Sequence, residues 1–226
     1  MRSDLMKTDG LMGMVRMTLL IAACPLFLHV PLLALPVFPE SAPATTSAER
    51  SSLADGETVV STSDLDDGVT SVRGMIRVDA PAASIWRALT DYDNQKNFVP
   101  KVRESGLISD NGTEQEMFSV GRTGVLFFKK TVTIQLLLKG DYPKRLSFRQ
   151  TKGDFKLYRG EWTITRLEGV PGRVLTFRAH LKPDFFAPDF FVRAVQKKDL
   201  PGILLAMKER AEGMAGEIHG AAGKLP

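Results

Sequence analysis

Six segments between residues 102 and 182 have the features of β-strands and follow one another without an intervening helix. They cover residues 102–109, 115–120, 125–138, 145–150, 155–166 and 173–182. The breaks between them carry Asp, Asn, Gly and Pro, the residues that form tight turns. Successive strands joined by short turns predict an antiparallel meander.

Apolar residues alternate along these strands, which predicts one apolar and one polar face for the sheet. The apolar face carries Val132, Ile134, Leu136, Leu138, Leu146, Phe148, Trp162, Ile164, Leu175, Phe177 and Ala179. The polar face carries Thr131, Thr133, Gln135, Lys139, Arg149, Arg178 and Lys182. An apolar sheet face must be covered by another element of the fold.

The C-terminal segment offers that cover, because its apolar residues recur with the spacing of one helix face. They are Phe190, Phe191, Ala194, Val195, Ile203, Leu204, Met207, Ala211 and Met214. We expect a long helix across the sheet, kinked or divided at Pro201-Gly202, where Asp199 is placed to cap a second piece.

The region before the meander predicts a hairpin and two short helices. Residues 58–63 and 69–78 are rich in β-formers and flank a turn-like cluster at 64–68. Asp79-Ala-Pro81 then supplies a helix start, and Ile85, Trp86 and Leu89 share one face of a short helix that ends near Asp93. Residues 94–100 predict a second helical turn.

The first 44 residues have the order of an export signal. Arg2, Lys7 and Arg16 precede an apolar run over residues 17–38, and Ala42-Pro-Ala44 fits a cleavage site. We predict a signal peptide at 1–44 and an exported, periplasmic or membrane-associated protein. Two alternatives stay open: a lipoprotein acylated at Cys24, within a lipobox-like Ile21-Ala-Ala-Cys24, and an uncleaved membrane anchor, since about 20 apolar residues span a bilayer.

The remaining boundaries follow from composition. Residues 45–56 are small and polar and predict a flexible linker. Residues 57–217 form the predicted folded domain, and residues 218–226 a disordered tail. The net charge of +4 is spread without a basic block, so we expect no nucleic-acid partner.

Catalytic and metal-binding constellations are not evident. Cys24 is the single cysteine, and the three histidines, His29, His180 and His219, do not form a ligand cluster or a triad. His180 falls on the polar phase of its strand, which indicates a surface position. We therefore predict no catalytic residues, no metal and no cofactor, and we do not expect an enzyme.

Two further groups of charged residues have structural interpretations. Asp91 and Asp93 fit helix-end and turn roles. Glu161 and Arg159 fit a solvated charge pair on the outer face of the sheet.

Several landmarks resemble the START-like, polyketide-cyclase and coenzyme-Q-binding superfamily (SRPBCC, helix-grip) over residues 72–211. They are Val78-Asp-Ala-Pro81, Ile85-Trp86, Leu89-Thr-Asp-Tyr-Asp93, Phe98-Val-Pro100, Tyr158-Arg-Gly-Glu-Trp162 and Lys198-Asp-Leu-Pro201, the last preceded by the phenylalanine-rich stretch 183–191. The resemblance implies an α+β helix-grip fold: a curved antiparallel sheet wrapped around a long C-terminal helix, with two short helices after the first strands.

The resemblance also implies an interior cavity for a lipid, quinone or sterol-like molecule. The residues expected to line it are Trp86, Val132, Ile134, Leu136, Phe148, Tyr158, Trp162, Ile164, Phe177, Leu204 and Met207, with an entrance at Phe185, Phe186 and Phe190. The Tyr158 hydroxyl is placed to meet a ligand oxygen, and the phenylalanine pairs also suit contact with a membrane surface.

Non-catalytic binding or transport of a hydrophobic small molecule or lipid is therefore the favoured function. A cyclase or dehydratase on the same scaffold is one alternative, and a membrane-tethered protein-interaction module with a filled interior is another. A larger ring at the small inward residue Ala179 should enter vacant space if the interior is open and overpack it if the interior is filled. The oligomeric state is left open by the sequence.

Overall fold

The computed structural model describes residues 44–125, 128–187 and 189–222, excluding the side chains of 123–125, 128–129, 189–191 and 218–222. The predictions for the leader, including the signal peptide and acylation of Cys24, lie outside these residues. The helices are α1 (Ser47–Ala54), η1 (Asp66–Gly68), α2 (Ala82–Leu89), η2 (Tyr92–Asn94), α3 (Gln95–Phe98) and α4 (Asp189–Ala222). The strands are β1 (Val59–Leu65), β2 (Val69–Val78), β3 (Val102–Asp110), β4 (Glu114–Val125), β5 (Phe128–Asp141), β6 (Arg145–Gly153), β7 (Phe155–Thr165) and β8 (Arg173–Pro183).

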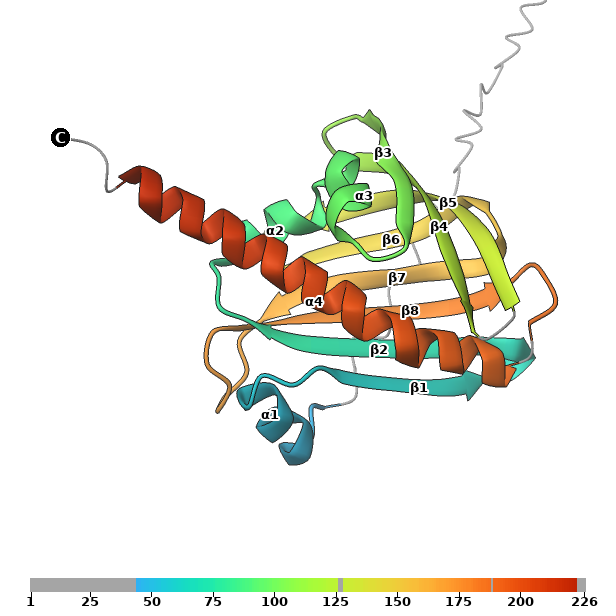
Figure 1. Ribbon diagram of the computed structural model, residues 1–226, viewed down its shortest axis with the longest axis horizontal. Coiled ribbons are helices and arrows are strands. Elements are labelled where there is room, and N and C mark those ends of the chain that lie inside the picture. The colour runs from blue at the N-terminus through green and yellow to red at the C-terminus, as the bar shows by residue number, and fades with distance from the viewer. Residues whose placement is uncertain (1–43, 126–127, 188, 223–226) are drawn as a thin grey trace, which may run out of the picture. The chain divides into compact units, whose positions relative to one another are not determined.

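The eight strands form one antiparallel sheet in the order β1-β2-β8-β7-β6-β5-β4-β3 (Figure 1). Strands β3 to β8 form the predicted meander, in which each strand pairs with the next one along the chain. The N-terminal hairpin joins this meander through β2, which pairs with β8. The predicted hairpin, meander and α+β fold class are confirmed.

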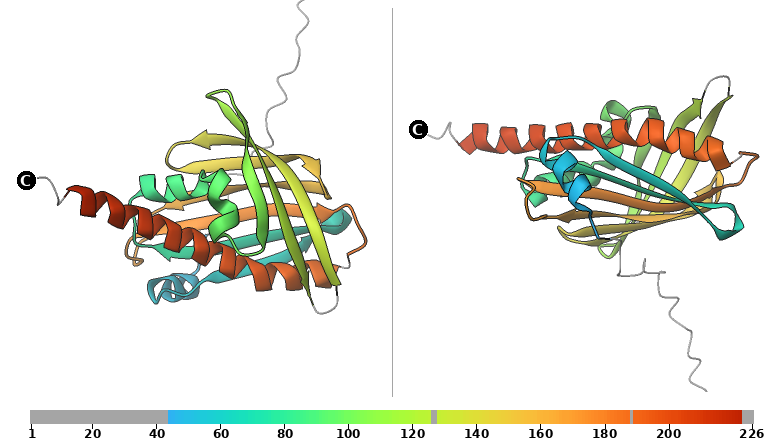
Figure 2. Two further views of the ribbon diagram at one scale, coloured as in Figure 1. Left: turned by 45° about the horizontal axis from the view of Figure 1, so that its top comes forward. Right: turned by 90° about the horizontal axis from the view of Figure 1, so that it is seen from below.

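Helix α4 runs along the inner face of the curved sheet (Figures 1 and 2). Leu200 and Leu204 are buried against β2, and they approach Gly74 so closely that a Cβ there would lie 2.7 Å from the nearest Leu200 carbon. A larger residue at position 74 would force the Leu200 and Leu204 side chains to shift where this helix crosses the sheet.

Two features of this helix differ from the predictions. Of the two outcomes expected at Pro201, a kink or a division, the division is wrong, because α4 continues through Pro201. Residues 218–222, predicted as disordered tail, still belong to the helix. Proline removes one intrahelical hydrogen bond, which is a local cost. Burial of Leu200 and Leu204 on either side of the proline holds both halves of the helix on the same sheet face.

The predicted linker is also wrong, because residues 47–54 form α1. Thr46 and Glu49 make a capping box: the Glu49 amide donates to Thr46 Oγ1 at 3.2 Å, and the Thr46 amide donates to Glu49 Oε2 at 2.8 Å. Leu53 is fully buried in a small cluster with Met75 and Val174, which point to the outer face of the sheet. Leu53 is the one leucine in this polar stretch, and it could have indicated that the segment packs against the domain.

The outer face is more buried than its polar character predicted. Glu161 is 6% exposed and forms ion pairs at 3.5 Å with Arg178 of β8 and with Arg145 of β6. The expected solvated pair with Arg159 is wrong, because the strand register places Glu161 directly opposite Arg178.

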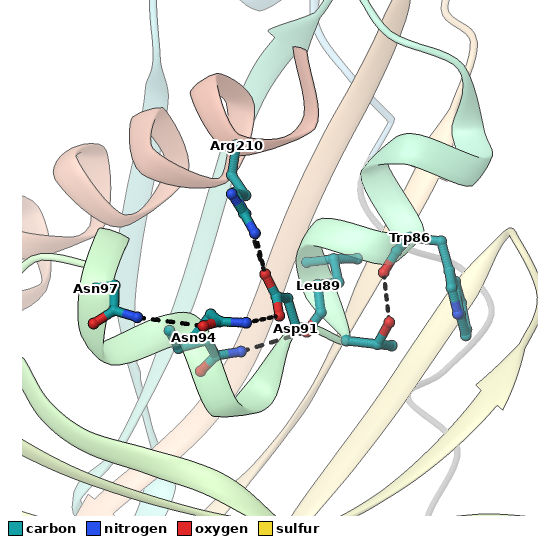
Figure 3. Close-up of polar contacts among 8 residues, drawn as sticks. Trp86, Leu89, Asp91, Asn94, Asn97 and Arg210 are labelled. Carbon is teal, nitrogen blue, oxygen red and sulfur yellow. Dashed lines mark hydrogen bonds and ion pairs between the residues drawn. The ribbon is translucent and has the colours of Figure 1, made fainter. Parts of the chain in front are cut away.

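Helices α2, η2 and α3 lie beside α4 and are tied to it by Asp91 (Figure 3). Arg210 of α4 donates to Asp91 Oδ2 at 2.7 and 3.1 Å, and Asn94 donates to Asp91 Oδ1 at 2.7 Å. Asp93 accepts a hydrogen bond from the Leu107 amide. Asp91 lies directly before η2, as a helix-end residue would, but its side chain makes no capping hydrogen bond. The side chains of both aspartates instead join these helices to distant segments, Asp91 to α4 and Asp93 to β3.

In the part of the chain described, no helix is long and apolar enough to cross a membrane.

Candidate functional site

A cavity of about 250 Å³ lies between the first half of α4 and the inner face of the sheet. The sheet contributes Val132 and Ile134 of β5, Phe155, Tyr158 and Trp162 of β7, and Phe177 and Leu181 of β8. Helix α4 contributes Val192, Val195, Gln196, Asp199, Leu200 and Ile203. Most of this lining is apolar because the alternation of each strand turns its apolar residues toward the helix.

Five of the eleven predicted lining residues reach this cavity. They are Val132, Ile134, Tyr158, Trp162 and Phe177. Leu136, Phe148, Ile164, Leu204 and Met207 are instead part of the packed core, together with residues of α2. Trp86 lies away from the cavity, with its ring edge-on to Tyr142 at 5.4 Å.

Of the predicted entrance residues, one lines the cavity and another does not. Phe185 lines the cavity and lies beneath Lys130, whose Nζ is 4.1 Å from the ring centre. Phe186 is 95% exposed and does not line the cavity. The Phe190 side chain lies outside the described residues.

The inner face of the sheet is thus filled at one end and open at the other. The short helices and the second half of α4 cover the filled end, where Ile85, Leu89 and Met207 pack against the strands. Ala179, the small inward position, lies on β8 between Phe177 and Leu181, which both line the cavity. Ala179 itself is fully buried opposite Gly160 and Val72 and is absent from the cavity lining.

Sequence reasoning missed the polar part of the lining. Lys101, Ser119, Arg122, Gln196 and Asp199 all contribute to it. Lys101 and Asp199 form an ion pair, and the Arg122 amide donates to the Lys101 carbonyl at 3.0 Å. Lys101 and Arg122 are exposed as well as lining, so the cavity opens to solvent beside them. No spacing in the sequence links residues 101, 122 and 199, which only the fold brings together.

Tyr158, which is half-buried, supplies a hydroxyl on the opposite wall. Its ring contacts Phe148 and Phe155, each with ring centres 5.2 Å apart. Burial raises the pKa of Tyr158 to about 12, so the hydroxyl stays protonated at neutral pH. Among the described residues, none forms a hydrogen bond with this hydroxyl, nor with the side chains of Ser119 and Gln196.

The titratable side chains of the lining lie mostly at one end of the cavity. The charged lining groups are the paired Lys101 and Asp199 and the exposed Arg122, all near the opening. Within the described ranges, no group of three histidine, cysteine or acidic side chains is placed to hold a metal ion. The cavity therefore offers apolar contact area and a few neutral hydrogen-bonding groups.

Comparison with solved structures finds the same fold in proteins of low sequence identity. TTHA0849 from Thermus thermophilus matches with a TM-score of 0.54 and 19% identity, over 64% of this chain and 99% of that one. The ZhuI aromatase/cyclase from Streptomyces sp. R1128 matches with a TM-score of 0.54 and 17% identity, over 64% and 94%. Human STARD10 matches with a TM-score of 0.52 and 13% identity, over 83% and 88%.

No functionally curated protein matches the sequence. The family described as polyketide cyclase/dehydrase and lipid transport matches residues 78–208, which is more than half of the chain. That match and the helix-grip architecture agree with the landmarks at Val78-Asp-Ala-Pro81 and Tyr158-Arg-Gly-Glu-Trp162. The chain therefore belongs to the polyketide cyclase/dehydrase and lipid transport family.

Proposed function

We propose that the domain binds and carries a hydrophobic small molecule in its cavity without transforming it. The observation that carries this proposal is the cavity of about 250 Å³ beneath α4, bounded by Val132, Ile134, Trp162 and Phe177. Transfer of apolar surface from water into such a site contributes about 25 cal/mol per Å². That driving force binds a ligand without any catalytic group.

An enzyme of the cyclase or dehydratase type is the second candidate, since the family includes both activities. It would need an acid or base that faces the reacting atoms. Of the titratable lining groups, Asp199 is paired with Lys101, Arg122 is exposed, and Tyr158 lies on the sheet wall. A pKa of about 12 leaves Tyr158 protonated, and therefore a poor base, at neutral pH. This favours the carrier.

The proposal is tested by what the purified protein holds. Native mass spectrometry of the protein, followed by solvent extraction, should show a stoichiometric apolar molecule that leaves on denaturation. Incubation with that molecule should return it chemically unchanged. An empty protein that takes up no apolar compound would contradict the carrier and favour the interaction-module alternative. Turnover of the bound molecule would favour the enzyme.

We also propose that the domain contacts a membrane surface through Phe186. This ring is 95% exposed and adjoins Phe185, which lines the cavity. An exposed aromatic ring beside a cavity suits insertion into the interfacial region of a bilayer. Phe186→Ser should weaken binding to phosphatidylglycerol/phosphatidylcholine vesicles, whereas Leu205→Ser, at a half-exposed leucine of α4, should not. Equal binding by both variants would contradict this contact.

We propose in addition that residues 1–44 are an export signal, with the lipoprotein and the uncleaved anchor as alternatives. Cleavage after Ala44 would leave the groups that dock α1 on the mature chain: Thr45 accepts a hydrogen bond from Arg73 at 3.2 Å, and Thr46 caps the helix. N-terminal sequencing of the protein from a bacterial host should begin near Thr45. An acylated Cys24, or an intact apolar segment in the membrane fraction, would favour one of the alternatives.

A further inference from the structure

We infer that the ligand is a compact amphiphile, with one ring system or one short chain, whose oxygen accepts a hydrogen bond from Tyr158. A phospholipid with two acyl chains is excluded as the enclosed ligand. The inference rests on the proposed function, because it specifies what the carrier holds.

The volume of the cavity limits the size of the ligand. An apolar protein cavity of about 150 Å³ accommodates benzene, which amounts to roughly 25 Å³ per carbon. On that scale a cavity of about 250 Å³ holds on the order of ten carbon atoms. Each acyl chain of a membrane lipid spans half of a hydrocarbon core about 30 Å thick. Two such chains exceed the space several-fold, whereas two fused rings fill it.

Aromatic rings make up much of the cavity wall. Trp162 and Phe177 have ring centres 4.7 Å apart, and Phe155 and Tyr158 have ring centres 5.2 Å apart with a 31° angle between their planes. All four rings line the cavity. The planes of Trp162 and Phe177 are tilted by 48°, so the lining presents both ring faces and ring edges, which suit offset-stacked or edge-to-face contact with an aromatic ring of a ligand.

The Tyr158 hydroxyl is available to form a hydrogen bond with a ligand. Among the described residues it has no hydrogen-bond partner, although it lies on the wall of an otherwise apolar region. Solvent reaches this hydroxyl in the open cavity, and a ligand that excludes solvent must offer the hydroxyl a new partner, because an enclosed hydroxyl without one is unfavourable. A ligand oxygen that accepts its proton provides that partner, whereas a pure hydrocarbon leaves the group unsatisfied.

The Tyr158 hydroxyl has a proton to donate to the ligand. Burial raises its pKa to about 12, so the hydroxyl stays protonated at neutral pH, and a carbonyl, which can only accept, would pair with it through that proton. Ser119 and Gln196 line the same cavity and offer further polar contacts to the ligand.

Two model compounds on the same bicyclic frame test the inference. Tetralin is the hydrocarbon, and 1-tetralone adds one carbonyl acceptor. Binding of each to the full-length protein is measured by titration calorimetry for the wild type, for Tyr158→Phe and for Tyr142→Phe. The last variant removes a hydroxyl from a tyrosine that is 62% exposed and outside the cavity, so it is the matched control.

Tyr158→Phe should weaken 1-tetralone binding by roughly 2- to 10-fold, the range expected for one hydrogen bond, and change tetralin binding by less than about 2-fold. Tyr142→Phe should change neither. Val132→Phe, which narrows the cavity, should weaken both compounds. Dimyristoylphosphatidylcholine should give no complex with one enclosed lipid per protein.

Three results would overturn the inference. Tyr158→Phe could weaken the two compounds equally or not at all, or the phospholipid could bind in the cavity. In each of these cases a cavity that binds apolar molecules remains, and the proposed function stands. If neither compound nor any other apolar molecule binds, the proposed function fails together with the inference.

Discussion

At the scale of single residues, Glu161 occupies the most demanding position on the outer face of the sheet. Its side chain is 7% exposed and lies between Arg178 and Arg145, which are 24% and 45% exposed. The carboxylate is therefore largely removed from water and depends on two guanidinium groups that themselves remain partly hydrated. Such a group is costly to leave unpaired and stabilising when paired.

Replacing Glu161 by glutamine should lower the free energy of unfolding by about 1 to 2 kcal/mol. The amide keeps the shape but removes the charge that balances Arg178 and Arg145. Urea unfolding monitored by circular dichroism measures the change. Glu168→Gln, at an exposed turn residue, is the control and should change stability by less than about 0.5 kcal/mol. Equal stability of both variants would show that the Glu161 pairs contribute nothing.

His180 is the residue that should make stability depend on pH. Burial, together with the nearby charge of Arg159 directly opposite on β7, lowers the pKa of His180 below 6.5. The unfolded chain then binds a proton more readily than the folded one. Stability is therefore complete above pH 6.5 and decreases as the pH falls from there through the lowered pKa.

His180→Gln should remove part of this decrease. The midpoint of thermal unfolding, recorded between pH 7.5 and 5, should fall less steeply for the variant than for the wild type. Every other titrating group is shared by the two proteins, so the difference in slope belongs to His180. Parallel curves would contradict the account of its environment.

The sequence predicted cavity-lining residues correctly where the alternation within a single strand decides the direction of the side chain. Tyr158, Trp162 and Phe177 lie on the cavity wall because strand alternation fixes the side to which each points. Gln196 and Asp199 could not be found in this way. Both are polar residues of α4, and they line the cavity because of the angle at which the helix crosses the sheet, a property of the whole fold.

At the scale of elements, α1 shows how much a short helix depends on its packing. Eight residues are too few to form a stable helix alone in water. Its capping box, the ion pair of Glu49 with Arg73 at 2.8 Å and the burial of Leu53 supply the stabilisation. Burial raises the pKa of Glu49, but hydrogen bonds from Thr46 and the charge of Arg73 outweigh it, so the pKa is lower than usual.

Leu53→Ala should lower the free energy of unfolding by about 2 to 3 kcal/mol, because the leucine is fully buried between α1 and the outer sheet face. Ser51→Ala, at an exposed position of the same helix, is the control and should be close to neutral. Denaturant unfolding of both variants measures this. A neutral Leu53→Ala would restore the prediction that this segment is only a linker.

Strands and helices were predicted accurately where turn residues and apolar alternation indicated the same boundaries. The prediction failed where contacts between distant segments determine whether an element forms or continues. All eight strands were anticipated because Gly, Asp, Asn and Pro punctuate the runs of β-formers. The continuity of α4 through Pro201 was not anticipated. The local cost of a proline is visible in the sequence, whereas the compensating burial of Leu200 and Leu204 is a property of the packed helix.

At the scale of the whole molecule, the central feature is the division of one sheet face into a filled end and a hollow end. The alternating pattern is the same in both, so sequence alone placed Leu136, Phe148 and Ile164 in the cavity although they belong to the core. What separates the two ends is the position of the short helices. They lie over one end of the inner face (Figure 1), whereas the cavity at the other end is bounded by the first half of α4 together with residues 100–102, after α3, and Phe185 and Ala187, before α4.

The most direct test of this division compares two substitutions to phenylalanine. Val132 lines the cavity, whereas Ala179 is fully buried against Gly160 in the packed core. For each variant, the unfolding midpoint and the amount of co-purified apolar ligand are measured on the same preparation. A ring at Val132 should enter vacant space, lose the ligand and change stability by less than about 1 kcal/mol, whereas a ring at Ala179 should overpack the core and cost about 1 to 3 kcal/mol or more. Equal destabilisation by Val132→Phe and Ala179→Phe, with no ligand in the wild type, would mean that the interior is filled throughout and would contradict the carrier.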